Sequence, residues 1–152
     1  MRLVATALAA VLLAAAPAAH AADGLIRTES PYSVATTLDR LADALKAKGL
    51  TVFARVDHAA NAAGAGLDLP PTRVLIFGNP RLGTPLMRER RSVAIDLPQK
   101  ALAWKDKDGQ VWLAYNDPAW LAERHGLDPD SGTLGKIDKA LERFSRKATR
   151  AE

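Results

Sequence analysis

The chain has 152 residues, of which 48% are apolar and 25% are charged, and its formal net charge is +4. This length accommodates one domain, or one domain and a short export segment, and the apolar content excludes wholesale disorder. The chain has no cysteine, which excludes disulfides, thiolate metal sites, cysteine nucleophiles and lipid-modified cysteine anchors. Composition therefore indicates a small globular domain and does not name a reaction.

The N-terminus has the pattern of a signal peptide. Arg2 supplies a positive charge, residues 3–16 are all Ala, Leu, Val or Thr, and Pro17 interrupts the run. The small residues of Ala19-His20-Ala21 then match a signal-peptidase site. The run is shorter than the roughly 20 residues of a transmembrane helix. We therefore expect cleavage after residue 21 and a periplasmic protein, with onward secretion left open and no transmembrane segment in the mature form. The alternative is a buried N-terminal helix.

Residues 22–152 are expected to form one domain, because they show no repeat, linker or break in composition. Removal of Arg2 leaves 20 Lys and Arg against 17 Asp and Glu, a net charge of +3. These charges are spread along the chain, whereas a nucleic-acid-binding protein clusters them. We therefore expect no nucleic-acid partner.

The first elements of this domain are a strand, a helix and a second strand. Residues 25–28 are extended, and Ser33 is placed to cap a helix that ends at Lys48 before Gly49. Apolar side chains recur along this helix at helical spacing. Residues 50–57 then alternate between two faces, which predicts a half-buried strand.

The middle of the domain predicts two short helices and two extended segments. Residues 58–63 are Ala-rich and helical, whereas residues 73–77 are apolar without alternation, as in a central strand covered on both faces. Thr84-Pro85 predicts an N-cap and first-turn proline for a helix that ends at Arg91. Residues 93–97 are expected to be extended.

The C-terminal part predicts a hairpin and two helices. Residues 101–105 and 110–115 flank an Asp-Lys-Asp-Gly turn. Asp117-Pro118 begins a helix that ends at His125, and a final amphipathic helix over residues 134–148 docks on the core. Strands and helices without regular alternation indicate an α+β fold, a mainly antiparallel sheet with helices on one face.

An ordered series of short motifs extends along residues 37–127. It consists of Arg55-Val56-Asp57-His58, Phe77-Gly78-Asn79-Pro80, Gly83-Thr84-Pro85-Leu86-Met87, Asp96-Leu97-Pro98, Tyr115-Asn116-Asp117-Pro118 and Glu123-Arg124-His125-Gly126-Leu127. In this order and spacing they resemble the bacterial family catalogued as domain of unknown function 302. The resemblance implies an α+β fold, homodimers and export, and it supplies no catalytic residues. Some members have a cysteine after the Leu-Pro pair, where this chain has Gln99.

The pair Asp57-His58 is the first candidate for chemistry. With Asp96, it could serve an acid–base enzyme or a metal-assisted hydrolase. A zinc site would need both His58 and His125 and a carboxylate. The alternative is that Asp57 or His58 caps the Ala-rich helix, and that His125 interacts with a helix dipole. No recognisable motif in the sequence predicts a metal or a cofactor.

The second candidate is a polar ligand site. Arg55, Asp57, Asn79, Arg81 and Asp96 lie near strand ends and proline turns, with Arg81 as the contact for an anion. The alternative for Asn79 is that its side chain bonds its own turn.

We therefore expect a periplasmic homodimer that binds a small ligand or assists a partner protein, and we favour this over an enzyme because no catalytic set is recognisable. The alternatives are the hydrolase that uses Asp57, His58 and Asp96, and a structural or envelope-stress interaction protein.

Overall fold

The computed structural model describes residues 24–151, so the predicted signal peptide of residues 1–21 lies outside the described part of the chain. Within that part, no helix is long and apolar enough to cross a membrane. The elements follow in the order β1 (Leu25–Ser30), α1 (Val34–Lys46), β2 (Thr51–Asp57), α2 (His58–Gly64), β3 (Thr72–Gly78), α3 (Pro80–Glu89), the 3-10 helix η1 (Arg91–Ile95), β4 (Gln99–Lys105), β5 (Val111–Asn116), α4 (Pro118–His125) and α5 (Gly132–Thr149).

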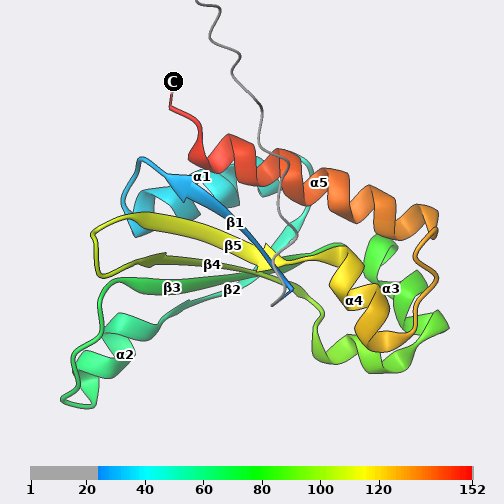
Figure 1. The fold of residues 1–152 in the computed structure, drawn as a ribbon, viewed down its shortest axis with the longest axis horizontal. Coiled ribbons are helices and arrows are strands. Elements are labelled where there is room, and N and C mark those ends of the chain that lie inside the picture. The colour runs from blue at the N-terminus through cyan, green and yellow to red at the C-terminus, as the bar shows by residue number, and fades with distance from the viewer. Residues whose placement is uncertain (1–23, 152) are drawn as a thin grey trace, which may run out of the picture.

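The five strands form one sheet in the order β1-β5-β4-β3-β2, and every neighbouring pair is antiparallel. Helices α1 and α5 lie side by side over one face of this sheet, as Figure 1 shows. The predicted α+β fold, with an antiparallel sheet and helices on one face, is confirmed. The opposite face is not covered by these two helices.

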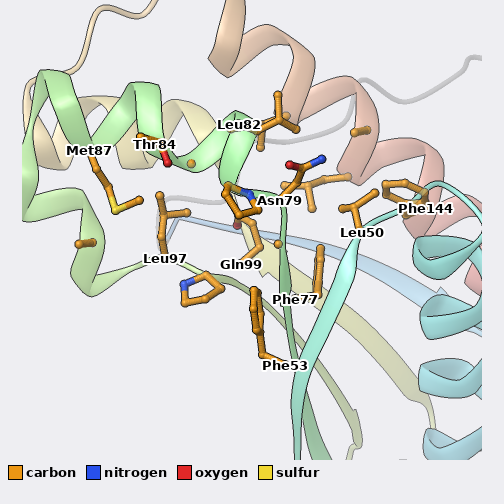
Figure 2. Close-up of a pocket in the computed structure, with 18 residues that line it drawn as sticks. Leu50, Phe53, Phe77, Asn79, Leu82, Thr84, Met87, Leu97, Gln99 and Phe144 are labelled. Atoms are coloured by element: carbon orange, nitrogen blue, oxygen red, sulfur yellow. The ribbon is translucent and has the colours of Figure 1, made fainter.

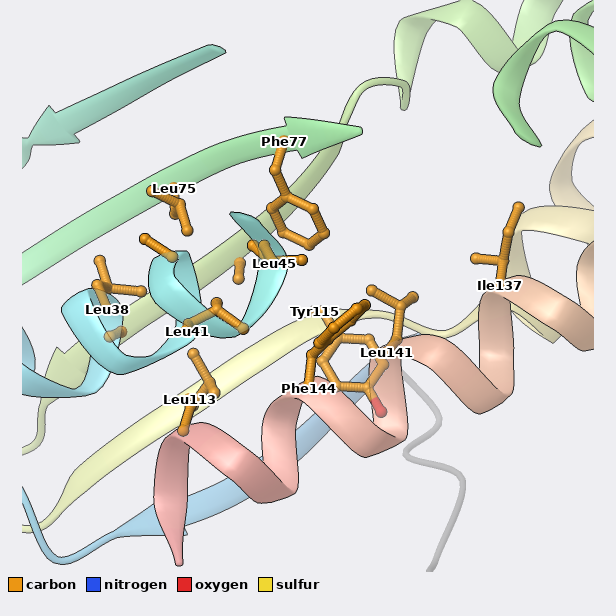
Figure 3. Packing of buried hydrophobic residues seen from close by; sticks show 14 of the residues in the cluster. Leu38, Leu41, Leu45, Leu75, Phe77, Leu113, Tyr115, Ile137, Leu141 and Phe144 are labelled. Atoms are coloured by element: carbon orange, nitrogen blue, oxygen red, sulfur yellow. The ribbon is translucent and has the colours of Figure 1, made fainter. Parts of the chain in front are cut away.

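The core lies between that helix pair and the sheet (Figure 3). Helix α1 contributes residues at helical spacing, helix α5 contributes another such row, and the central strands contribute every second residue. Side chains that meet in this core include Leu38, Leu41, Leu45, Leu75, Phe77, Leu113, Tyr115, Ile137, Leu141 and Phe144. Their burial holds the two helices in register over β3, β4 and β5.

The two ends of the sheet differ. Helix α2 extends from one end, whereas α3, η1 and α4 gather at the opposite end (Figure 1). Both α3 and α4 begin with a capping side chain followed by a proline: Asn79 Oδ1 accepts the N–H of Arg81 at 2.9 Å, and Asp117 Oδ1 accepts the N–H of Ala119 at 2.8 Å. This pairing satisfies helix-end donors and fixes where each helix leaves the sheet.

Three local predictions were wrong. Strand β3 is buried on one face only, because Leu75 and Phe77 are buried while Val74 and Ile76 on the other face are half-buried. Helix α3 begins at Pro80 rather than at Pro85, which lies inside it.

The segment predicted to be extended over residues 93–97 is instead largely the 3-10 helix η1. Its hydrogen bonds are local, as in the bond from the Asp96 N–H to the Val93 carbonyl at 3.0 Å. Val93 is buried and Ile95 is 72% exposed, so the segment anchors itself through one side chain without joining the sheet.

Candidate functional site

A cavity of about 260 Å³ opens at the end of the sheet where α3, η1 and α5 meet. Its walls come from the ends of β2, β3 and β4 and from those three helices, as Figure 2 shows. The lining consists of Leu50, Phe53, Phe77, Gly78, Asn79, Pro80, Leu82, Gly83, Thr84, Met87, Ala94, Leu97, Pro98, Gln99, Ile137, Ala140, Leu141 and Phe144. Most of these side chains are apolar and none carries a charge.

Local sequence explains why the cavity stays open. Gly83 lies on the side of α3 that faces the cavity, and a Cβ there would lie 3.7 Å from Leu97 Cδ1 and 3.8 Å from Met87 Cε. A glycine inside a helix costs about 1 kcal/mol relative to alanine. Ala140 is the corresponding small residue on α5. Two small residues on facing helices therefore leave room that larger side chains would fill.

Gln99 is one of the three residues with a polar side chain in the cavity wall, with Asn79 and Thr84. It is the first residue of β4, it stands opposite Phe77 in the sheet register, and it is 8% exposed. Figure 2 shows its side chain between Leu97 and Phe77, close to the N-terminus of α3. Within the described part of the chain, neither its Oε1 nor its Nε2 has a hydrogen-bond partner. An unpaired buried polar group costs about 1–3 kcal/mol.

Of the five residues predicted to bind a ligand, Asn79 is the one that lines the cavity. Its Oδ1 atom accepts the N–H of Arg81, so it caps α3 as the alternative interpretation expected. Arg81 itself is exposed and is not part of the cavity wall.

The predicted pair Asp57-His58 lies at the other end of the sheet, where α2 begins. Asp57 Oδ1 accepts the N–H of Ala60 at 3.0 Å, and its Oδ2 lies 2.8 Å from Arg73 Nε. The backbone hydrogen bond from Ala60, together with the charge of Arg73, lowers the pKa of this carboxyl. Asp57 therefore caps α2, and Arg55 nearby pairs with Asp39 of α1.

Asp96 is buried at the cavity end of the sheet. His125 Nε2–H donates to Asp96 Oδ2 at 2.6 Å, and Arg124 lies 3.3 Å from Asp96 Oδ1. Ser92 Oγ lies 3.0 Å from His125 Nδ1. In serine hydrolases the serine contacts Nε2 of the histidine and the aspartate contacts Nδ1, whereas the two ring nitrogens are exchanged here. None of the three residues lines the cavity. The cluster joins the end of η1 to the end of α4.

The structure does not bring the predicted catalytic set together. Asp57 pairs with Arg73 at the start of β3. Asp96 lies shortly before Gln99, which pairs with Phe77 near the end of β3. The hydrolase that would use Asp57, His58 and Asp96 is not supported by this placement. His58 and His125 are likewise separated, and residues 24–151 contain no group of three His, Asp or Glu that could hold a metal ion.

Sequence reasoning missed Gln99, although its signal was visible. Positions 99, 101 and 103 share one face of β4, and Ala101 and Ala103 are buried there against the core. A glutamine in register with two buried alanines is a polar residue on an apolar face. That pattern indicates either a specific hydrogen-bond partner or a ligand.

Comparisons with other proteins show which family the chain belongs to. Residues 26–144 match the family described as "Domain of unknown function DUF302". The chain belongs to this family. Its fold is similar to the crystal structure of an uncharacterized conserved DUF302 protein from Bacillus stearothermophilus, with a TM-score of 0.73 and 22% identity over 84% of this chain and 99% of that one.

Part of the chain is also similar to larger proteins. It is 57% identical over 104 residues to proteins named "Fluoride-specific ion channel FluC 1" from Brucella suis biovar 1 and from Brucella abortus biovar 1. The match covers 68% of this chain but only 41% and 38% of those two proteins. The chain therefore spans about two fifths of the curated relatives that it matches.

Proposed function

We propose that this protein is an exported binding protein whose site is the cavity between α3, η1 and α5. The observation that carries the proposal is the cavity itself: about 260 Å³ of space walled by apolar side chains, with few polar groups. Small-molecule sites have this character, an apolar wall with a small number of placed polar groups. Export rests on the N-terminal pattern of residues 1–21.

The test is binding of small apolar molecules to the purified protein, followed by thermal unfolding and calorimetry. A ligand that binds only the folded state raises the melting temperature by mass action. We expect molecules of about one aromatic ring to raise it, and Gly83→Leu and Ala140→Leu to abolish the rise by filling the cavity from α3 and from α5. Leu69→Ala, an exposed substitution outside the cavity, is the matched control. Binding that survives both filling variants would overturn the proposal.

The homodimer remains part of the proposal, and the uncovered face of the sheet supports it. Trp104 and Trp112 are paired across β4 and β5 on that face, with ring centroids 6.5 Å apart. Val74, Ile76 and Leu102 continue the apolar surface and are half-buried. Both tryptophans are half-buried, and tryptophans on an apolar sheet face are typical of an interface. We expect sedimentation to give a dimer that Trp112→Lys dissociates, and a monomer at micromolar concentration would contradict it.

A second candidate function is an accessory role at a membrane channel, favoured by the identity to part of the Brucella proteins named as fluoride channels. The uncharged lining of the cavity does not suit fluoride, so the candidate role is contact with a channel rather than transport. We expect deletion of the matched segment from the Brucella suis protein to change fluoride efflux from vesicles. Unchanged efflux would remove this candidate.

A further inference from the structure

The buried amide of Gln99 indicates which class of molecule fits the cavity. We propose that the ligand is a small neutral carboxamide or lactam whose amide edge pairs with Gln99 and whose apolar body fills the space beside it. This inference rests on the proposed binding function. Two observations support it: the apolar cavity, and a side chain in its wall that is 8% exposed and has two unpaired polar atoms.

The hydrogen-bonding groups of the Gln99 side chain determine which chemical group of a ligand matches it. A glutamine amide presents an acceptor, Oε1, and a donor, Nε2–H, on one planar edge. A second amide or a lactam presents a donor and an acceptor in the same arrangement, so two parallel hydrogen bonds satisfy both atoms. An alcohol forms one of these bonds and leaves the other atom unpaired. A carboxylate offers only acceptors, so one of its oxygens would face Oε1.

The uncharged wall of the cavity excludes ionised ligands. None of the residues that line the cavity is charged, and an ionised group moved into such an apolar space is strongly disfavoured unless a partner charge meets it. The nearest predicted anion contact, Arg81, is exposed and lies outside the wall. The ligand is therefore neutral at the pH where it binds.

The volume and the walls of the cavity indicate which group is attached to the amide of the ligand. A volume of about 260 Å³ is roughly nine times the ~30 Å³ that one water molecule occupies in the liquid. This space accepts one six-membered ring, or a short branched chain, attached to the amide. Phe53 and Phe77 provide aromatic walls, and Met87 provides a polarisable wall that adapts to the ring.

The experiment compares three probes of similar shape in calorimetry and thermal unfolding. Benzamide carries the amide edge, isopropylbenzene has the same outline without polar atoms, and benzoate carries a charge. We expect benzamide to bind the protein more tightly than isopropylbenzene, and benzoate to bind least. Equal binding of benzamide and isopropylbenzene would overturn the ligand class, because water would then serve Gln99 as well as the ligand does.

Two variants separate this inference from the proposed function. Gln99→Met keeps the length of the side chain and removes both hydrogen-bonding atoms, so we expect benzamide to bind about 10- to 100-fold more weakly while isopropylbenzene binds at least as well. Ala140→Leu fills the cavity, so we expect it to weaken both probes. If both probes bind and neither responds to Gln99→Met, the ligand class is wrong and the cavity remains a binding site. If neither probe binds the unaltered protein, the proposed function fails as well.

Discussion

His125 Nε2 lies 2.6 Å from Asp96 Oδ2, and this hydrogen bond joins the last residue of α4 to the residue that directly follows η1. The His125 side chain is 5% exposed and that of Asp96 is 12% exposed, so the bond is largely protected from solvent. Leu97, Pro98 and Gln99 follow Asp96 directly and form one wall of the cavity. The pair therefore fixes the backbone from which the cavity is built.

Removing the imidazole tests this role. We expect His125→Ala to lower the free energy of unfolding by about 1.5–3 kcal/mol, because it leaves a buried carboxylate without its shortest hydrogen bond. Ser92→Ala is the control, since Ser92 contacts the same ring but is exposed, and we expect a change of about 0.5 kcal/mol or less. Urea unfolding measures both. Equal effects of the two substitutions would show that the Asp96–His125 bond contributes little.

The hairpin between β4 and β5 gives a prediction on acid sensitivity. Trp112 Nε1–H donates to Asp106 Oδ2 at 2.8 Å, and the N–H groups of Asp108 and Gln110 donate to Oδ1. The hydrogen bond from Trp112, with those backbone bonds, lowers the pKa of Asp106 below its ordinary value of 3.8. Its contribution to stability is therefore present above pH 3.8 and is lost as the pH falls through the lower pKa of the folded state.

Asp106→Asn is the matched variant for that prediction, because it retains the size of the side chain and removes the charge. We expect it to lower the urea midpoint of unfolding at neutral pH. The difference in urea midpoint between the variant and the unaltered protein should become smaller as the solution becomes acid. A difference that stays constant down to the acid limit would mean that the carboxylate charge does not stabilise the turn.

Tyr115 gives the corresponding prediction at alkaline pH. Burial, followed by the negative charges of Asp138 and Glu142 on α5, raises the pKa of this phenol to about 12. A raised tyrosine pKa stabilises the folded state below about pH 10, the ordinary value, and this contribution is lost as the pH rises toward 12. Absorbance of tyrosinate measures the titration, with Tyr115→Phe as the reference. The chain has a second tyrosine, Tyr32, so a transition near pH 10 that loses amplitude in Tyr115→Phe would contradict the prediction.

The unligated protein should become more stable when Gln99 is replaced. Gln99→Met removes two unpaired buried atoms and keeps the volume, so we expect the free energy of unfolding to rise by about 0.5–2 kcal/mol. Asn79→Ala is the contrasting variant in the same wall; it removes the cap of α3 and should destabilise by about 1 kcal/mol. A loss of stability in Gln99→Met would show that the amide has a partner within the protein.

The elements that sequence predicted well are those with a strong local signal. Gly126 caps α4 with a φ of 64°, and Gly49, with a φ of 72°, lies in the turn after α1, which ends at Lys46 rather than at Lys48. The Asp-Lys-Asp-Gly turn forms the hairpin between β4 and β5. Residues 79–91 contain two places where a capping side chain is followed by a proline. Asn79-Pro80 rather than Thr84-Pro85 begins α3, because Asn79 directly follows β3 and its side chain reaches the first turn.

The candidate site depended on contacts that sequence does not contain. Asp57 and Asp96 look equivalent along the chain, since both lie at the end of an element, but the antiparallel register places them at opposite ends of β3. Conversely, Gln99 and Ala140 are 41 positions apart in the printed sequence and line one cavity. Of the charged residues that the sequence predicted, Asp57 caps a helix, Arg55 and Asp96 form ion pairs and Arg81 is exposed. The proposed site, by contrast, is apolar and uncharged.

The most direct test of the ligand assignment is NMR of the Gln99 side-chain amide in the ¹⁵N-labelled protein, with Gln99→Met to assign its signal. We predict that benzamide shifts this NH₂ resonance together with the methyl signals of Met87 and Leu97, and that isopropylbenzene shifts only the methyl signals. The account would be contradicted if benzamide left the Gln99 resonance in place while it bound, or if its shifts fell on residues outside the cavity.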